Sequence, residues 1–215
     1  MRKLVIFGGS GIGMIAASIA EDNKSHEVLG FLNDIFPVGE TIGKYKTFPV
    51  LGDSTDYVKF LNDPEVDFFI AYVGMKKEKS VFNKVKSLEI PEARWATLIH
   101  STAIIPEGFC KIGKGVLIAP LCQLSADTTV SDNCIMLPNS FLGHDSFMDE
   151  FSHIATNGVV GANVHIGKAC HIGSNATIRE KVTIGDFSLV GAASMVLKDV
   201  GEEEIVIGNP ARPLK

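Results

Sequence analysis

Residues 112–199 repeat with a period of six. Every sixth residue from Ile112 to Val196 is aliphatic, and the residue that follows is Gly, Ala or Ser at eleven of these fifteen positions. This period predicts a parallel β-helix, in which each hexapeptide forms one short strand and one turn. The aliphatic residue points inward, and the small residue allows the chain to fold sharply at a corner. Three hexapeptides make one triangular coil, and coils are stable only as a stack because one coil cannot bury its own core.

Four cysteines test this register. Cys110, Cys122, Cys134 and Cys170 are separated by multiples of six, so they share one phase of the repeat. The other residues of that phase are small, which marks it as an inward-facing position. No two cysteines are separated by three hexapeptides, so none faces another on an adjacent coil. The sequence therefore predicts buried, unpaired thiols, no metal site, and a reducing cytoplasm as the compartment.

The first 95 residues lack this period and alternate between strand and helix patterns. The order predicts a small parallel, Rossmann-like sheet. The chain would then divide into an α/β domain at 1–96 and a β-helix domain with a C-terminal tail at 97–215. Within the first domain, strands are expected at 3–9, 26–34, 47–53 and 66–74, and helices at 10–22, 54–63 (with Ser54 as N-cap) and 76–89.

Charge and hydropathy exclude several classes of partner. The net charge is −5 and no stretch concentrates Lys and Arg, which argues against binding to nucleic acid. No apolar run reaches the roughly 20 residues that a membrane helix needs. Residues 1–20 carry two positive charges and an apolar stretch, as secretory signal peptides do, but four glycines interrupt that stretch. We expect a strand and a helix there, and no membrane insertion.

A glycine-rich turn precedes the first expected helix. Residues 8–13 read Gly-Gly-Ser-Gly-Ile-Gly, a loose match to the dinucleotide-binding fingerprint because serine stands at the middle glycine. Amides at a helix N-terminus attract phosphate or another anion. Asn33 and Asp34 end the second expected strand, where a ribose- or base-binding acid lies in such folds. The turn is interpreted as an anion site, and a turn that serves packing alone is the alternative.

Histidines mark one part of the repeat. Residues 143–145 read Gly-His-Asp, and His153 follows His144 by nine residues. His153, His165 and His171 share the phase just before the inward aliphatic residue, so we expect them to face outward. His144 occupies a different phase, near a corner. Solvated surface is the simplest interpretation of His165 and His171.

Three features together resemble one known family. They are the short α/β domain with its glycine turn, the hexapeptide repeat, and the Gly-His-Asp pattern with its second histidine and the terminal Gly-Asn-Pro-Ala-Arg-Pro-Leu-Lys. They are similar to those of the bacterial sugar O-/N-acyltransferases, which include acetyltransferases of nucleotide-linked 4-amino sugars and sialic acid O-acetyltransferases. The resemblance covers essentially the whole chain. It implies a left-handed β-helix, acetyl-CoA as cofactor, a nucleotide-linked amino sugar as substrate, and a homotrimer with acetyl sites between neighbouring prisms.

The resemblance also implies roles for individual residues. His144 would be the general base, and Asp145 would increase its basicity; imidazole suits this task because it exchanges a proton near neutral pH. His153 would contact acetyl-CoA. The remaining cofactor positions are Gly161 and Ala162, as amide donors to the oxyanion, with Ser174 and Ala192. The substrate positions are Ser10, Gly11, Ile12, Asn33 and Asp34.

Several functions stay open at this point. N-acetylation of a nucleotide-linked 4-amino-4,6-dideoxy sugar and O-acetylation of a sugar such as sialic acid would use the same base and cofactor. A zinc enzyme of the carbonic anhydrase type needs three converging histidines, and its pair of histidines five residues apart does not occur here. A trimeric scaffold without catalysis is a further possibility, which acetyl-CoA binding would distinguish.

Overall fold

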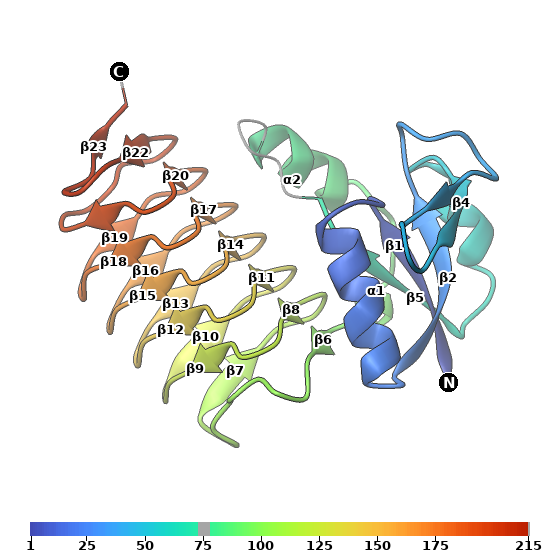
Figure 1. Ribbon diagram of the computed structural model, residues 1–215, viewed down its shortest axis with the longest axis horizontal. Coiled ribbons are helices and arrows are strands. Elements are labelled where there is room, and N and C mark those ends of the chain that lie inside the picture. The colour runs from blue at the N-terminus through green and yellow to red at the C-terminus, as the bar shows by residue number, and fades with distance from the viewer. Residues whose placement is uncertain (73–77, 215) are drawn as a thin grey trace. The chain divides into compact units, whose positions relative to one another are not determined.

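The structure, a computed structural model, describes residues 1–72 and 78–214 and contains two compact units (Figure 1). The first unit comprises residues 1–72 and 88–98. Among the described residues, the second comprises 78–87 and 99–214. The sequence places 78–87 in the first domain, whereas in the structure this segment groups with the β-helix.

The first unit contains a five-stranded sheet in the order β3-β4-β2-β1-β5. Strands β1, β2, β4 and β5 are parallel, and β3 runs antiparallel to β4. All residues of β5 and the last four of β1 are buried, as expected for parallel strands that are covered on both faces. The predicted parallel sheet is confirmed. The bounds are β1 Arg2–Phe7, β2 His26–Leu32, β3 Thr41–Ile42, β4 Phe48–Gly52 and β5 Val66–Ile70.

Helix α1 (Ile12–Asp22) follows β1 directly and buries an alanine-rich face. The helix expected at 54–63 is only a 3₁₀ turn, η1 (Asp56–Phe60), and Ser54 does not cap it. That prediction is wrong: the side chain that accepts a backbone amide before this turn is Asp53, whose Oδ1 accepts from the Thr55 amide at 2.7 Å. A second 3₁₀ turn, η2, spans Glu92–Arg94.

The second unit is a left-handed parallel β-helix whose coils stack in register (Figure 1). Each strand pairs with the equivalent strands of the coils before and after it, as Phe147 does with Thr129 and His165. Three flat faces result, named here in chain order. Face I contains β7 Cys110–Ile112, β10 Thr128–Val130, β13 Phe147–Met148, β16 His165–Ile166 and β19 Thr183–Ile184. Face II contains β6 Leu98–Ile99, β8 Leu117–Ile118, β11 Ile135–Met136, β14 His153–Ile154, β17 His171–Ile172, β20 Leu189–Val190, β22 Ile205–Ile207 and β23 Arg212–Pro213. Face III contains β9 Gln123–Leu124, β12 Phe141–Leu142, β15 Val159–Val160, β18 Thr177–Ile178 and β21 Met195–Val196.

The core of the β-helix has the predicted register. From Ile118 to Val196, every aliphatic residue of the repeating phase is at most 2% exposed. Cys122, Cys134 and Cys170 are buried in the same core, and all cysteines are unpaired. Burial raises the pKa of the Cys170 thiol to about 12, so this thiol is neutral in the folded protein.

The corners turn at a different residue from the one expected. Asp127, Asp145 and Asn163, which occupy the same position on three successive coils, have φ values of 59°, 58° and 57°. Asp and Asn adopt this left-handed conformation more readily than most residues. Gly143 does not have a positive φ; a Cβ there would lie 2.5 Å from the carbonyl carbon of Gly161 on the next coil. The small residues therefore permit close stacking of coils, and the residue two positions later makes the turn.

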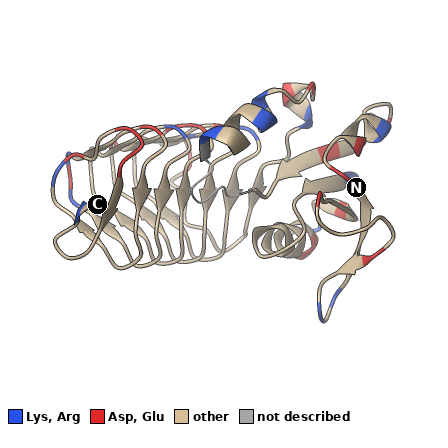
Figure 2. Ribbon diagram, turned by 90° about the horizontal axis from the view of Figure 1, so that it is seen from above, with Lys and Arg blue, Asp and Glu red and all other residues tan. Residues whose placement is uncertain are grey.

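Helix α2 (Glu78–Lys86) packs against the β-helix at the corner between faces I and II. The Phe82 ring meets Phe151 and Phe187 edge-on, with centroid distances of 5.2 and 5.7 Å. Lys86 pairs with Glu150 on the same corner. Aromatic contacts and ion pairs therefore anchor α2 to the coils, and Figure 2 shows the basic residues of α2 in blue. None of the helices in the described residues is long and apolar enough to span a bilayer.

Candidate functional site

His144 lies at the corner between faces III and I, in the turn from β12 to β13. Its carbonyl oxygen accepts a hydrogen bond from the Asn163 amide of the next coil, at 2.8 Å. Nearby, the buried Ser146 hydroxyl donates to the Gly161 carbonyl at 2.9 Å and accepts from the Val164 amide at 3.0 Å. The backbone that carries His144 is therefore fixed to the coil above it.

The side chains of His144 and Asp145 form a hydrogen-bonded pair. Nδ1 of His144 lies 2.6 Å from Oδ2 of Asp145, and the two side chains are 59% and 53% exposed. A carboxylate at Nδ1 holds the proton there and leaves the lone pair on Nε2. No described residue forms a hydrogen bond with Nε2. Such an arrangement can present a basic nitrogen to a ligand.

The coil above His144 supplies a backbone N–H beside it. Of the two amides predicted to stabilise an oxyanion, that of Gly161 donates to the Ile178 carbonyl at 2.9 Å. The amide of Ala162, which lies one full coil after His144, donates to no acceptor in the described residues. The geometry therefore favours Ala162 as the donor available to a ligand.

His153 lies in β14 on face II and is only 5% exposed, so the expectation that it is an exposed side chain is wrong. Its Nδ1 lies 3.1 Å from Nδ1 of His171. Its Nε2 is buried without a hydrogen-bond partner in the described chain. Burial, reinforced by the charge of His171, lowers the pKa of His153 to about 3, which keeps this imidazole neutral at physiological pH. Its contact with acetyl-CoA stays a prediction.

The other cofactor positions lie at a different corner. Ser174 and Ala192 occupy the turns between faces II and III on two adjacent coils. Both are at least partly exposed, and the Ser174 carbonyl accepts from the Ala193 amide at 2.8 Å. His144 is at the corner between faces III and I. One chain therefore does not bring Ser174 and Ala192 beside His144.

The predicted nucleotide residues lie at the carboxyl edge of the sheet in the first unit. Gly11 (φ 52°) is exposed and caps α1, which has no side-chain cap and no acidic residue in its first turn. Ser10 is exposed and Ile12 partly so. Asn33 is buried, and its Oδ1 accepts from the amides of residues 35 and 36 at 2.8 and 3.1 Å. Asp34 is exposed next to it. Asn33 therefore shapes the loop that presents Asp34.

Comparison with known proteins agrees with this architecture. A family model described as the PglD N-terminal domain matches residues 3–85. The acetyltransferase domain of PglB from Neisseria gonorrhoeae is 26% identical, with a TM-score of 0.86 over 100% of both chains. The same domain in complex with acetyl coenzyme A is 27% identical, with a TM-score of 0.84 over 99% of both chains. Over its whole length the chain is similar to these acetyltransferase domains, and it shares their fold.

Two further proteins share the fold of this chain at lower identity. A mutant of perosamine N-acetyltransferase from Caulobacter crescentus, in complex with CoA and GDP-perosamine, is 20% identical, with a TM-score of 0.85 over 100% of this chain and 98% of that one. WeeI from Acinetobacter baumannii is 21% identical, with a TM-score of 0.80 over 100% of both chains. A search of curated protein sequences found no match.

The structure places Tyr72 and Asp53 close to the residues predicted to bind the nucleotide. Tyr72 follows β5, which lies next to β1; its ring is 3.3 Å from the point where Gly8 would carry a Cβ. Burial, followed by the charges of Asp34 and Asp53, raises the pKa of Tyr72 to about 12. Tyr72 could have been found from the order of the strands. The strand order reverses at β1, and ligands of such sheets bind at that point, next to the end of β5.

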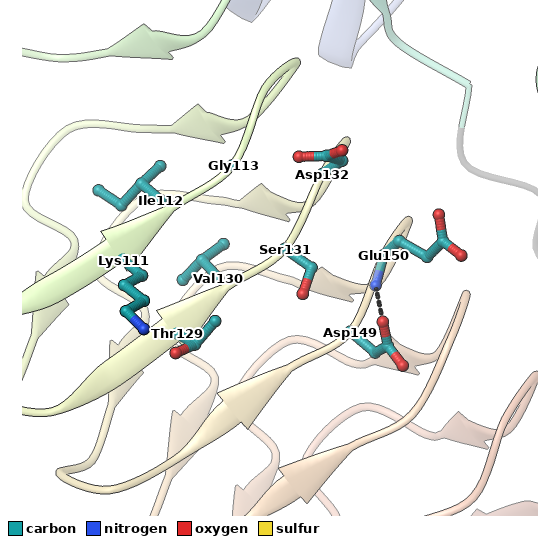
Figure 3. A pocket seen from close by; sticks show the side chains of 9 residues that line it. All are labelled: Lys111, Ile112, Gly113, Thr129, Val130, Ser131, Asp132, Asp149 and Glu150. Carbon is teal, nitrogen blue, oxygen red and sulfur yellow. Dashed lines mark hydrogen bonds between the residues drawn. The ribbon is translucent and has the colours of Figure 1, made fainter. Parts of the chain in front are cut away.

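A hollow of about 350 Å³ on face I is lined by none of the predicted site residues (Figure 3). Its carboxylates have structural partners: Oδ1 of Asp132 accepts from the Lys114 amide, and Oδ1 of Asp149 from the Glu150 amide, both at 2.8 Å. In the part of the chain that the structure describes, no group of His, Cys, Asp and Glu is arranged to hold a metal ion. The Oδ1 atoms of these two carboxylates are therefore already paired with backbone amides.

Proposed function

We propose that this acetyl-CoA-dependent acyltransferase transfers an acetyl group to the amine of a nucleotide-linked 4-amino-4,6-dideoxy sugar, with His144 as the general base. The observation that carries the proposal is the exposed imidazole, whose Nδ1 bonds Asp145 at 2.6 Å and whose Nε2 has no partner in the described residues. The backbone of this corner is already held by the next coil. The side chain of His144 therefore has no structural task that would explain its presence.

The residues around His144 supply the parts of an acyl transfer. Acetyl-CoA supplies a thioester, whose acetyl carbon bonds to the amine while the bond to sulfur breaks. Nε2 of His144 takes the proton that the attacking nitrogen loses, which contributes about 10²–10⁴ in rate. Asp145 keeps the proton on Nδ1 and stabilises the imidazolium. The Ala162 N–H donates to the oxygen on which negative charge develops. The proton on His144 then passes to the departing thiolate.

The corner between faces II and III fits an uncharged pantetheine arm. Its turns at 119–122, 137–140, 155–158, 173–176 and 191–194 contain no Asp, Glu, Lys or Arg, unlike the edges where Figure 2 shows charge. Ser174 and Ala192 belong to this corner and are small. The buried Nε2 of His153, without a partner in the described chain, adds a polar group that a ligand would satisfy.

The first unit fits the nucleotide part of the substrate. The N-terminus of α1 offers amides to a diphosphate, since no side chain caps it. The carboxylates of Asp34 and Asp53 lie near Tyr72, where they can accept hydrogen bonds from a base or a ribose. The complex of perosamine N-acetyltransferase with CoA and GDP-perosamine supports the same two classes of ligand here.

A homotrimer would complete the site. Face III exposes Val159 (39%) and, at its border, Leu121 (60%) and Ile104 (59%), and its outward strand positions carry no charge. Three copies that turn face III toward a common axis would place the corner of His144 in one copy beside the corner of Ala192 in the next. Each site would then combine a base from one chain with cofactor contacts from another. We expect this trimer in the cytoplasm.

Mixing two inactive variants tests the shared site. His144→Ala removes the base, and Ala192→Trp blocks the cofactor corner. If each site takes these residues from different chains, co-refolded mixtures should recover activity at about a quarter of the sites, because only one pairing of chains in four is intact on both sides. If one chain holds both residues, the mixture stays inactive.

A matched pair of acceptors tests the reaction. Nucleotide-linked 4-amino-4,6-dideoxy sugars and their 4-hydroxy analogues are incubated with acetyl-CoA, and thiol release is followed. We expect release with the amine, and a loss of more than about 10² in kcat for His144→Ala with the fold intact. Turnover of the hydroxyl analogue alone would favour the sugar O-acetyltransferase instead, and near-normal turnover by His144→Ala would remove His144 as the base.

A further inference from the structure

Two histidines form a contact on face II that the reaction described above does not use. His153 and His171 are paired in register on β14 and β17. Their rings are 4.8 Å apart at 73°, and the two Nδ1 atoms are 3.1 Å apart. His153 is 5% exposed, whereas His171 is partly exposed. Each ring reaches the other through the same nitrogen, and this geometry restricts where their protons can be.

A hydrogen bond between two Nδ1 atoms requires that one of them carries the proton. A neutral imidazole has a single N–H, on either nitrogen. If His171 donates, His153 accepts at Nδ1 and carries its own proton on Nε2. If His153 donates, its Nε2 is a bare acceptor. The direction of this bond therefore decides whether Nε2 of His153 is a donor or an acceptor.

The environment of the pair favours donation by His171. His153 is neutral, because burial lowers its pKa to about 3, so it has only one proton to place. His171 is partly exposed and can be an imidazolium or a neutral ring with its proton on either nitrogen. An imidazolium has no acceptor nitrogen and can only donate, and a neutral ring with its proton on Nδ1 also donates. In these two of the three states His153 carries its proton on Nε2.

Nε2 of His153 has no hydrogen-bond partner in the described chain, although it is buried. Buried polar atoms in folded proteins are nearly always paired, so such an atom points to a ligand or an ordered water. The acyl-pantetheine arm of the cofactor carries amide and thioester carbonyl oxygens, which accept hydrogen bonds. A donor at Nε2 matches those oxygens and an acceptor does not.

We propose that His171 is a positioning residue, which holds His153 in the tautomer whose Nε2–H donates to a carbonyl oxygen of the acyl-CoA. The proposal rests on the assignment of His153 to cofactor binding in the proposed function. It adds a role for a residue that the sequence pattern assigns to solvated surface. It also predicts that His171→Asn, whose side-chain amide can donate to Nδ1 of His153, will replace the imidazole in part.

The test compares three variants of the full chain. His171→Phe keeps a ring but cannot donate, His171→Asn keeps a donor, and His165→Phe is the control, because His165 has the same phase on face I. Nitrogen-15 NMR of labelled histidines reports the tautomer of His153, and calorimetry reports acetyl-CoA affinity. We expect the Nε2–H tautomer in the wild type and a mixture in His171→Phe, with affinity about tenfold weaker. His171→Asn should recover most of the affinity, and His165→Phe should match the wild type.

Several outcomes would overturn the proposal. One is an NMR spectrum in which His153 of the wild type carries its proton on Nδ1. The other is an affinity of His171→Phe for acetyl-CoA equal to that of the wild type. Should His171→Phe not fold, the wild-type tautomer and the affinity of His171→Asn still decide. If His171→Phe binds normally while His144→Ala abolishes turnover, this inference fails and the proposed function stands. If the tautomer and affinity respond as expected but no amine is acetylated, the proposed acceptor fails and the role of His171 stands.

Discussion

The hydrogen bond between Asp145 and His144 can be removed without disturbing the corner that carries it. Asp145→Asn keeps the shape of the side chain and removes its charge. Asn adopts the left-handed conformation as readily as Asp, and it already does so at equivalent corners of this β-helix, at residues 133, 139, 157, 163 and 175. We therefore expect the midpoint of thermal unfolding of Asp145→Asn to stay within about 2 °C of the wild type.

The expected loss of activity follows from the geometry of the pair. A hydrogen bond to an ionised group contributes about 1.5–3 kcal/mol, and the exposure of both side chains, 59% and 53%, favours the lower end of this range. Each 1.36 kcal/mol corresponds to a factor of ten in rate, so kcat should fall about 10- to 100-fold. An Asn amide can also donate to Nδ1, which moves the proton to Nε2 and removes the base. The KM for acetyl-CoA should not change.

Thiol release at saturating acetyl-CoA measures kcat, and thermal unfolding measures the fold. Asp145→Ala is the matched control, because Ala loses the carboxylate and is also less suited to the φ of 58°, which costs about 1–2 kcal/mol. It should lose both activity and stability, whereas Asp145→Asn should lose activity alone. A wild-type kcat in Asp145→Asn would show that the Asp145 carboxylate does not assist His144. Equal loss of stability in both variants would show that the charge of Asp145, and not only its backbone conformation, stabilises the fold.

Three further outcomes follow from the same structure. Gly173→Ala should lower the free energy of unfolding by about 1–3 kcal/mol in urea titrations, because its Cβ would lie 2.6 Å from backbone of the next coil, whereas Gly201→Ala, whose nearest neighbour is 3.6 Å away, should not. The thiol of Cys170 should resist modification in the native state and react after unfolding; because burial raises its pKa to about 12, the unfolded thiol ionises first and stability should fall as pH rises above about 9. The hydrogen bond from Lys3 lowers the pKa of Asp63 in the folded protein. The ionised Asp63 therefore stabilises the fold at pH values above the pKa of the unfolded state, and this stabilisation is lost in acid. Asp63→Asn should lower the free energy of unfolding at pH 7 but not near about pH 2, as measured by urea unfolding at both values.

The core of the β-helix was predictable because the repeat is local. Each coil contacts only the coils next to it, so a period of six read from the sequence suffices to identify inward residues such as Met136 and Ile172, both fully buried. The packing of an element against distant residues was not predictable in this way. Helix α2 lies within the helix predicted at 76–89, but Phe82 packs against Phe151 and Phe187, and nothing in the sequence around Phe82 specifies these partners.

In the candidate site, too, local features were predictable from the sequence and features that depend on distant contacts were not. His144 and Asp145 are adjacent in the sequence, so their pairing needed only a favourable turn, which the left-handed Asp145 provides. The contact of His153 with His171 follows from the register between adjacent coils. The burial of His153 does not follow from its phase in the repeat, because His165 has the same phase and is exposed. Tyr72 was missed for a related reason: its place beside Gly8 follows from the order of the strands in the sheet, which the sequence does not state.

The repeating structure explains why a reactive side chain at the turn of His144 need not destabilise the fold. The backbone at each coil is tied to its neighbours by the same ladder, as the amide of Asp145 is to the Ala126 carbonyl (3.2 Å) and that of Asn163 to the carbonyl of His144 (2.8 Å). The core is filled by other phases of the repeat, so the side chain at 144 contributes neither to the ladder nor to the core. Equivalent positions on other coils hold Ala162 and Glu180, which shows that this phase accepts unrelated side chains. If His144 is the proposed base, changes at 144 should lower turnover and change the free energy of unfolding by no more than about 0.5 kcal/mol.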